Sequence, residues 1–163
     1  GWRWFLLRCW RILVVALGRI FSIYEGTTQL QVVAAIRYIT NGTMLNNIKD
    51  MAAAEVSEAL QPLKARVEKL IPVYEAALNR VKDLNNQDAH DFLARRLYDM
   101  TCEIVMSLLI LDDATRAPEL FTKSANVYVR MTEEDVLGKA AYIQNFQVED
   151  LTSFRAAEES AAE

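Results

Sequence analysis

The sequence predicts an all-α fold, an antiparallel helical bundle of about five to six helices. Glycine and proline are scarce, with five and three residues in a chain of 163, which favours long helices joined by short connections. Apolar residues recur at alternating intervals of three and four, and no useful stretch has the alternation of a strand. Hydrophobic residues make up 52% of the chain, so a sizeable core is expected.

The first eighteen residues differ in composition from the rest. They hold all three tryptophans, and residues 1–21 carry four arginines and no acid. The uninterrupted apolar run at residues 12–17 is far shorter than the roughly 20 residues of a membrane span, which argues against one. A secretory signal and an Arg/Trp helix on a membrane surface are two alternatives. We favour a third hypothesis, a shifted reading frame or a chimeric join that ends near Arg19.

A first helix is predicted from Thr27 or Thr28 to Thr40, where Asn41-Gly42 supplies a stop signal. Its opening backbone N–H groups lack partners within the helix and attract phosphates and other anions. We expect residues 19–50 to end one domain and residues 51–146 to form a second, helical one. Residues 147–163 form a polar tail that is expected to fray.

The strongest periodicity of the chain follows. Its members predict one apolar stripe on a helix of the bundle core: Val56, Leu60, Leu63, Val67, Leu70, Tyr74, Ala77, Val81 and Leu84. Because Pro62 and Pro72 fall inside this stretch, a break or a kink is expected there.

Three further helices are predicted. The first runs from about Asp88 to Asp113 and is expected to be central, because residues 104–111 are apolar nearly all round. Pro118 opens a shorter helix at residues 118–131. Thr132, followed by three acids, is predicted to cap a last helix that ends near Asn145.

One short stretch has chemical content. Glu25 lies between Tyr24 and Gly26, just ahead of the first predicted helix. A carboxylate on a turn with apolar neighbours suits a general base, because such surroundings raise its pKa. Gly26 allows a close backbone approach to a ligand, and a group of hydroxyl and amide side chains follows: Thr27, Thr28 and Gln29. An ordinary turn is the competing interpretation.

The arrangement around Glu25 resembles the C-terminal signature of the acyl-CoA dehydrogenase family. The likeness starts at Arg19-Ile20 and covers residues 23–31, including the spaced pair Gln29 and Gln31. Residues 41–163 are similar to the extra helical C-terminal region of some bacterial members. The family's N-terminal helical domain, its flavin-binding sheet and most of its catalytic helical domain have no counterpart in these 163 residues.

The resemblance implies FAD-dependent α,β-desaturation of acyl-CoA thioesters. Glu25 matches the base that removes the α-proton, and its backbone N–H matches a donor to the thioester carbonyl. Gly26 matches a substrate contact, while Thr27, Thr28 and Gln29 match positions that hold the ADP part of FAD. Electrons pass to an electron-transfer flavoprotein in the dehydrogenases and to oxygen in related oxidases, and both remain open. The chain by itself is expected to be inactive.

Composition and charge limit the classes of partner and cofactor that the chain is expected to bind. A net charge of −4 gives no support to nucleic-acid binding. Cys9 and Cys102 make no disulfide framework and predict a cytoplasmic protein. His90 is the only histidine; we interpret it as a helix-surface residue, and no metal site is expected. The alternative to an enzyme fragment is a non-catalytic helical module, and either reading predicts a homo-oligomer.

Overall fold

The computed structural model describes the backbone of residues 28–152, with the side chains of Val32 and of residues 35–152. The chain divides into two units between Ala34 and Ala35. The helices are α2 (Thr28–Thr40), α3 (Thr43–Ala52), the short 3-10 helix η1 (Glu58–Leu60), α4 (Gln61–Asp83), α5 (Gln87–Arg116) and α6 (Pro118–Asn145). Residues 28–152 contain no strand, so the all-α prediction is confirmed.

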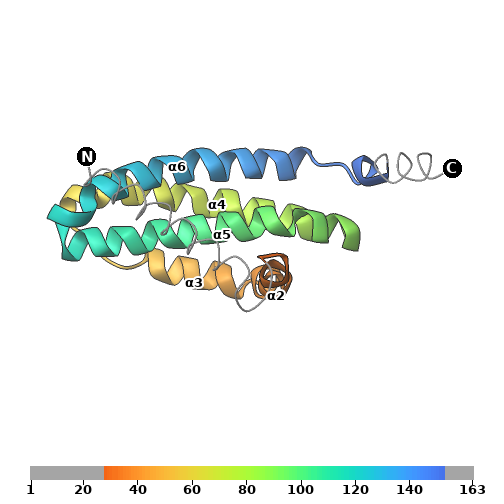
Figure 1. Cartoon of the computed structure of the whole chain (residues 1–163), viewed down its shortest axis with the longest axis horizontal. Helices are drawn as coiled ribbons and strands as arrows, with labels where there is room; N and C mark the ends of the chain where they lie inside the picture. Colours follow the sequence, from red (N-terminus) through yellow and green to blue (C-terminus); the bar gives the residue numbers. More distant parts are fainter. Residues whose placement is uncertain (1–27, 153–163) are drawn as a thin grey trace, which may run out of the picture. The chain divides into compact units, whose positions relative to one another are not determined.

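Three long helices form the centre of the second unit, residues 35–163. α4, α5 and α6 pack against one another in all three pairs, and α3 packs against α4 and α5. Figure 1 shows the three long helices side by side, with α3 beside α5. Consecutive long helices run antiparallel because their connections are short, a single residue, Ala117, between α5 and α6.

The predicted apolar stripe from Val56 to Leu84 lies mostly on α4, on the side of the helix that faces the core. Seven of its nine members are buried, and Val56 and Leu84 at its two ends are half-buried. On α5 all six predicted core residues are buried: Leu93, Leu97, Met100, Ile104, Leu108 and Leu111. α5 contacts α3, η1, α4 and α6, and α4 likewise contacts α3, η1, α5 and α6, so α5 shares the central position with α4. Met106 and Leu109 nevertheless lie exposed on its outer side.

Of the break or kink expected at the prolines, a break at Pro72 is wrong, and a kink there stays a prediction. α4 continues without interruption from Gln61 to Asp83, with Pro62 in its first turn and Pro72 inside it. A proline in the first turn loses no helical hydrogen bond. Pro72 deprives the Glu68 carbonyl of its donor, but Glu68 and Pro72 are exposed, where water can replace the lost N–H. Packing of the apolar side of α4 then holds the helix together.

The predicted boundary at Thr132 is also wrong. Residues 118–131 and 132–145 form the single helix α6, and Thr132 lies inside it with only 2% of its surface exposed. Its hydroxyl accepts a hydrogen bond of 2.9 Å from the Ser107 hydroxyl on α5. The local pattern of a threonine before three acids imitates a helix start. Tertiary contacts decide otherwise, because Val129 and Val136 on either side are both buried.

The turn after α2 is as predicted, and the helix after it was not anticipated. Asn41 and Gly42 separate α2 from α3, with Gly42 at a φ of 89° that favours glycine. The Asn41 side-chain oxygen accepts a hydrogen bond of 2.9 Å from the Thr43 backbone N–H. α3 then buries Leu45, Ile48 and Ala52. The three residues are spaced by three and four, as on one side of a helix, but three positions in a ten-residue segment are too few to predict a helix.

Candidate functional site

The predicted site residues lie largely outside the described part of the chain. Glu25, Gly26 and Thr27 precede it, and Thr28 and Gln29 are the first two residues of α2, described by their backbone alone. The first turn of α2 holds no acidic residue. Its unpaired N–H groups therefore have no carboxylate of their own helix as a competitor for an anion. The roles of all five residues remain predictions.

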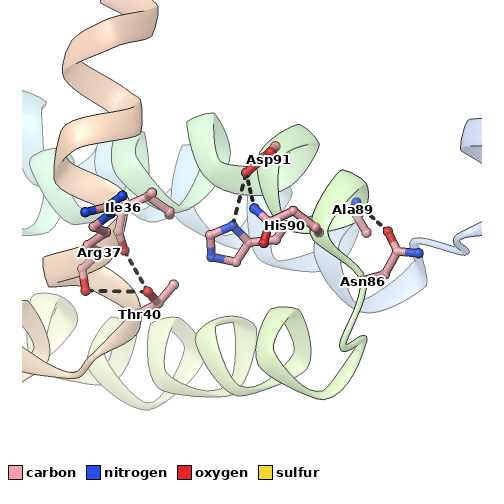
Figure 2. Close-up of polar contacts among 8 residues, drawn as sticks. Ile36, Arg37, Thr40, Asn86, Ala89, His90 and Asp91 are labelled. Atoms are coloured by element: carbon pink, nitrogen blue, oxygen red, sulfur yellow. Dashed lines mark hydrogen bonds and ion pairs between the residues drawn. The ribbon is translucent and has the colours of Figure 1, made fainter.

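His90 lies in the first turn of α5, half-buried. Its backbone N–H donates to the Asn86 carbonyl at 2.9 Å, and its Nδ1 lies 3.4 Å from Asp91 Oδ1. Figure 2 shows this contact and, on α2, the Thr40 hydroxyl that donates to the Ile36 carbonyl at 2.8 Å. Among residues 28–152, no group of three or more His, Cys, Asp or Glu side chains could hold a metal ion. The half-buried position of His90 in the first turn of α5 is that of a helix-surface residue.

Four buried hydroxyl groups of the bundle are paired with one another, Tyr74 with Thr101 and Ser107 with Thr132. The Tyr74 hydroxyl on α4 lies 2.8 Å from the Thr101 hydroxyl on α5, which also donates to the Leu97 carbonyl at 2.7 Å. Burial raises the pKa of Tyr74. Paired buried hydroxyls rigidify and specify a core, so we assign these groups to the packing of the three helices.

A group of titratable side chains lies along α5 and α6. Burial raises the pKa of the Cys102 thiol, and the hydrogen bond with Tyr98 offsets only part of that rise. A protonated thiol is a poor nucleophile. Desolvation likewise raises the pKa of Glu103, although Lys139 Nζ donates to its Oε1 at 2.8 Å. The second oxygen of Glu103 is buried without a partner. Neither of the two concave sites described next includes Glu103.

Two concave sites occur in the second unit. One, of about 300 Å³, lies between the end of α3 and the C-terminal half of α5, over an apolar floor that includes Met51, Leu108 and Leu111. At its edge, Lys64 Nζ donates to the Ala54 carbonyl at 2.7 Å, and Arg116 pairs with an aspartate on its own helix. Both cations thus already have partners within the bundle.

The other concave site is an open groove of about 400 Å³ between α5 and α6. It is lined by one α5 residue and five α6 residues: Ile110, Lys123, Ser124, Val127, Tyr128 and Met131. Val127 and Met131 are 60% and 55% exposed, and Met106 of the neighbouring α5 is also exposed. The groove is the deepest part of a wider apolar surface and offers no convergent catalytic groups.

Aromatic side chains fasten the end of α6. The Arg96 guanidinium lies 3.8 Å from the centre of the Tyr142 ring and 5.2 Å from that of Phe92. Phe92 stacks on the buried Phe146, whose carbonyl accepts a hydrogen bond of 3.1 Å from Arg80 on α4. These contacts join all three long helices at one end. The sequence analysis missed them, although Phe92 and Arg96 at i and i+4 are a recognisable helical pair.

Within the described residues, no helix is long and apolar enough to cross a membrane.

Comparisons with known proteins assign a family to the helical unit. Residues 40–151 match the family model described as "Acyl-CoA dehydrogenase C terminal". The chain is also similar to a solved structure of the acyl-CoA dehydrogenase family protein from Porphyromonas gingivalis, at 33% identity and a TM-score of 0.65. The match covers 70% of this chain and 98% of that chain, which therefore consists almost entirely of the matched helices. No curated protein matches significantly.

Proposed function

The chain belongs to the acyl-CoA dehydrogenase C-terminal family, and we propose that it combines the end of a catalytic domain with a non-catalytic assembly domain. The first part contains the Glu25 motif and the start of α2. The second part is the bundle of α3 to α6. The observation that carries the division is the extent of the family match, residues 40–151, which covers the bundle and stops short of Glu25.

In the catalytic part, the Glu25 carboxylate removes the α-proton of an acyl-CoA thioester. Its backbone N–H donates a hydrogen bond to the thioester carbonyl, where negative charge develops. Gly26 permits the backbone to approach the substrate closely. FAD, when bound, accepts the hydride from the β-carbon.

The start of α2 fits the phosphates of FAD. The helix begins at Thr28, and its first turn carries no acid, so free N–H groups at its positive end can bind a pyrophosphate. The hydroxyls of Thr27 and Thr28 and the amide of Gln29 add donors next to these N–H groups. This supports a role for Thr27, Thr28 and Gln29 in holding the ADP part.

In the assembly part, the buried hydroxyl groups have structural partners. Tyr74, Thr101, Ser107 and Thr132 are hydrogen-bonded to one another in pairs, and the pKa of Cys102 is raised rather than lowered. Active sites are usually marked by titratable groups that converge on a pocket. The bundle has instead an apolar outer surface on α5 and α6, which is typical of an interaction site.

Substitution of Glu25 in the intact dehydrogenase tests the catalytic assignment. Glu25→Gln is expected to lower desaturation at least about a hundredfold while the bound flavin spectrum is retained, because only the proton acceptor is lost. Glu68→Gln, an exposed carboxylate on α4, serves as the matched control and should retain turnover. Full activity of Glu25→Gln would refute the assignment.

Expression of the 163 residues by themselves tests the assembly assignment. The expected product is colourless, helical and oligomeric, and has no desaturase activity. Flavin that copurifies with the chain, or binding of acyl-CoA to it, would show that these residues hold a site of their own.

A further inference from the structure

Exposed large apolar side chains are concentrated on two helices of the bundle. Of the described residues, α5 and α6 hold eight and α4 holds none: Phe92, Met106, Leu109, Leu120, Val127, Met131, Leu137 and Tyr142. Leu120 is the most exposed of them, at 68%. An apolar patch of this kind is typical of an interaction surface.

Three exposed apolar residues of α6, Leu120, Val127 and Met131, belong to a regular stripe, which we call the α6 seam. It is spaced alternately by four and three residues, and every member is exposed: Leu120, Ser124, Val127, Met131, Glu134 and Gly138. The spacing is that of the contact positions of a coiled coil. The seam lies opposite the side of α6 that is buried in its own bundle, where Ala125, Val129 and Val136 lie.

Gly138 leaves open space on the seam into which a partner side chain could pack. It lies inside α6, where glycine costs roughly 1 kcal/mol relative to alanine. Its φ is not in the left-handed region, and a Cβ placed there would meet no atom within 4 Å. The fold of a single chain therefore does not need a glycine at this position. A glycine on a helix contact surface lets a large side chain of a partner pack against the backbone.

We propose that the α6 seam binds the α6 seam of a second copy of this chain, in antiparallel orientation about a two-fold axis. This proposal deepens the assembly role proposed above and rests on it. The seam is self-complementary when the axis passes at the level of Val129. Leu120 of one copy then packs on Gly138 of the other, and Val127 packs on Met131 of the other. Each contact occurs twice because the interface is isologous.

The same register pairs opposite charges. It places Glu134 of one copy opposite Ser124 of the other, beside the exposed Lys123. Symmetry produces two such Lys123–Glu134 contacts, one on each side of the axis. Arg130 is the cation nearest the axis, and Glu134 of its own helix lies one turn away, which offsets repulsion between the two copies of Arg130.

The alternative register, shifted by one heptad, is less complete. It pairs Leu120 with Met131 but leaves Gly138 without a partner residue and moves Glu134 to the end of α6. The register proposed here uses the whole seam, the 19 residues from Leu120 to Gly138, which span about 27 Å of helix. Ile110 of α5 lines the groove together with Val127 and Met131 and widens the surface available to the second copy.

The test exchanges the two charges in the full chain. Sedimentation over a dilution series measures the dimer dissociation constant for wild type, Lys123→Glu, Glu134→Lys and the double variant. Each single variant reverses two symmetric contacts and is expected to weaken the dimer at least about tenfold. The double variant restores the pairing and should return to within about threefold of wild type. Lys69→Glu on the exposed side of α4 is the matched control and should dimerise like wild type.

A second substitution separates assembly from folding. Gly138→Gln removes a helix glycine and should raise the thermal stability of the monomer, yet it blocks the position that Leu120 of the other copy occupies and should weaken the dimer. A wild-type chain that stays monomeric, or single charge variants that dimerise like wild type, would overturn the proposal. So would a double variant without rescue. None of these results bears on the Glu25→Gln test in the intact dehydrogenase, so failure of the seam leaves the catalytic assignment intact.

Discussion

α4 and α6 both pack on α5, and α4 also contacts α3 and η1, but the two helices differ most in their outer surfaces. Both pack on α5 and on each other, and each buries one apolar side. The exposed residues of α4 are charged, polar or small, or proline: Gln61, Pro62, Ala65, Glu68, Lys69, Pro72, Ala76, Asn79, Lys82 and Asp83. Those of α6 include Leu120, Val127, Met131, Leu137 and Tyr142. The apolar surface of α4 is thus used up within the chain, and that of α6 is not.

The difference shows which helix still exposes apolar surface whose burial would lower the free energy. A helix whose exposed side is polar leaves no large apolar area in contact with water, so it needs no further partner. α6 retains apolar area on the side away from the core, where burial would contribute about 25 cal/mol per Å². Four experiments, from the largest expected effect to the smallest, test whether the two helices differ as described.

The first experiment compares a buried leucine of α4 with an exposed one of α6. Leu70 is 2% exposed and Leu120 is 68% exposed. Leu70→Ala is expected to lower the free energy of unfolding by about 2–5 kcal/mol, because it removes core contacts and leaves a cavity. Leu120→Ala should change it by no more than about 0.5 kcal/mol in the monomer. Urea unfolding followed by circular dichroism at low protein concentration measures both, and equal losses would contradict the comparison.

The second experiment breaks the buried polar contact between α5 and α6 at Thr132. Thr132→Val keeps the shape of the side chain but leaves the buried Ser107 hydroxyl without its 2.9 Å partner. The expected loss is about 1–3 kcal/mol of unfolding free energy. Ser107→Ala combined with Thr132→Val should recover part of this loss, since neither buried hydroxyl then lacks a partner. An unchanged stability in Thr132→Val would mean that the hydroxyl is hydrated in the folded protein.

The third experiment concerns the proline inside α4. Pro72→Ala supplies the missing N–H to the Glu68 carbonyl, and the exposed position makes no packing contact to lose. Stability is expected to rise by about 1–2 kcal/mol, because restored helix geometry exceeds the entropy that proline removes from the unfolded chain. Pro62→Ala in the first turn is the matched control and should change stability by no more than about 0.5 kcal/mol. Thermal melts of the two variants decide the matter, and a fall for Pro72→Ala would refute the expectation.

The smallest effect is the pH dependence that Glu103 contributes. Desolvation holds the pKa of this carboxyl above its usual value of 4.5 in the folded state, so the folded protein binds the proton more tightly than the unfolded chain. The resulting stabilisation is fully present below the usual pKa and is lost as the pH rises through the raised pKa. Glu103→Gln should lack this fall. The unfolding free energies of wild type and Glu103→Gln at about pH 4 and pH 8 measure this fall. If Glu103 had the same pKa in the folded and unfolded states, the two proteins would show the same pH dependence.

Much of the bundle could be predicted because its helices are long and regularly patterned. The six core residues of α5 recur over five turns, so their period outweighs local exceptions. The break at Thr132 was predicted in error from four residues of capping pattern, which are outweighed by the burial of Val129 and Val136 on both sides. The break at Pro72 failed for the same reason, because propensity is a weak term beside packing.

The candidate functional regions also differ in how far the sequence predicts them. Residue types and spacing around Glu25 indicate a base, since a carboxylate, a glycine and hydroxyl groups within five positions are a local pattern. The α6 seam was not predicted, because Leu120, Val127 and Met131 have the same helical spacing as core residues. An outward apolar stripe can be told from a core stripe only after the structure shows which side of the helix the bundle covers.

The sequence by itself therefore determined the helical class, the central position of α5, the turn at Asn41-Gly42 and the resemblance around Glu25, because each depends on residues close together along the chain. Only the tertiary structure decided that α4 passes through Pro72, that α6 passes through Thr132, and that the seam from Leu120 to Gly138 faces outward. These three features depend on which surfaces of α4, α5 and α6 meet. Burial of apolar area between helices is worth several times the local preferences of a cap or a proline.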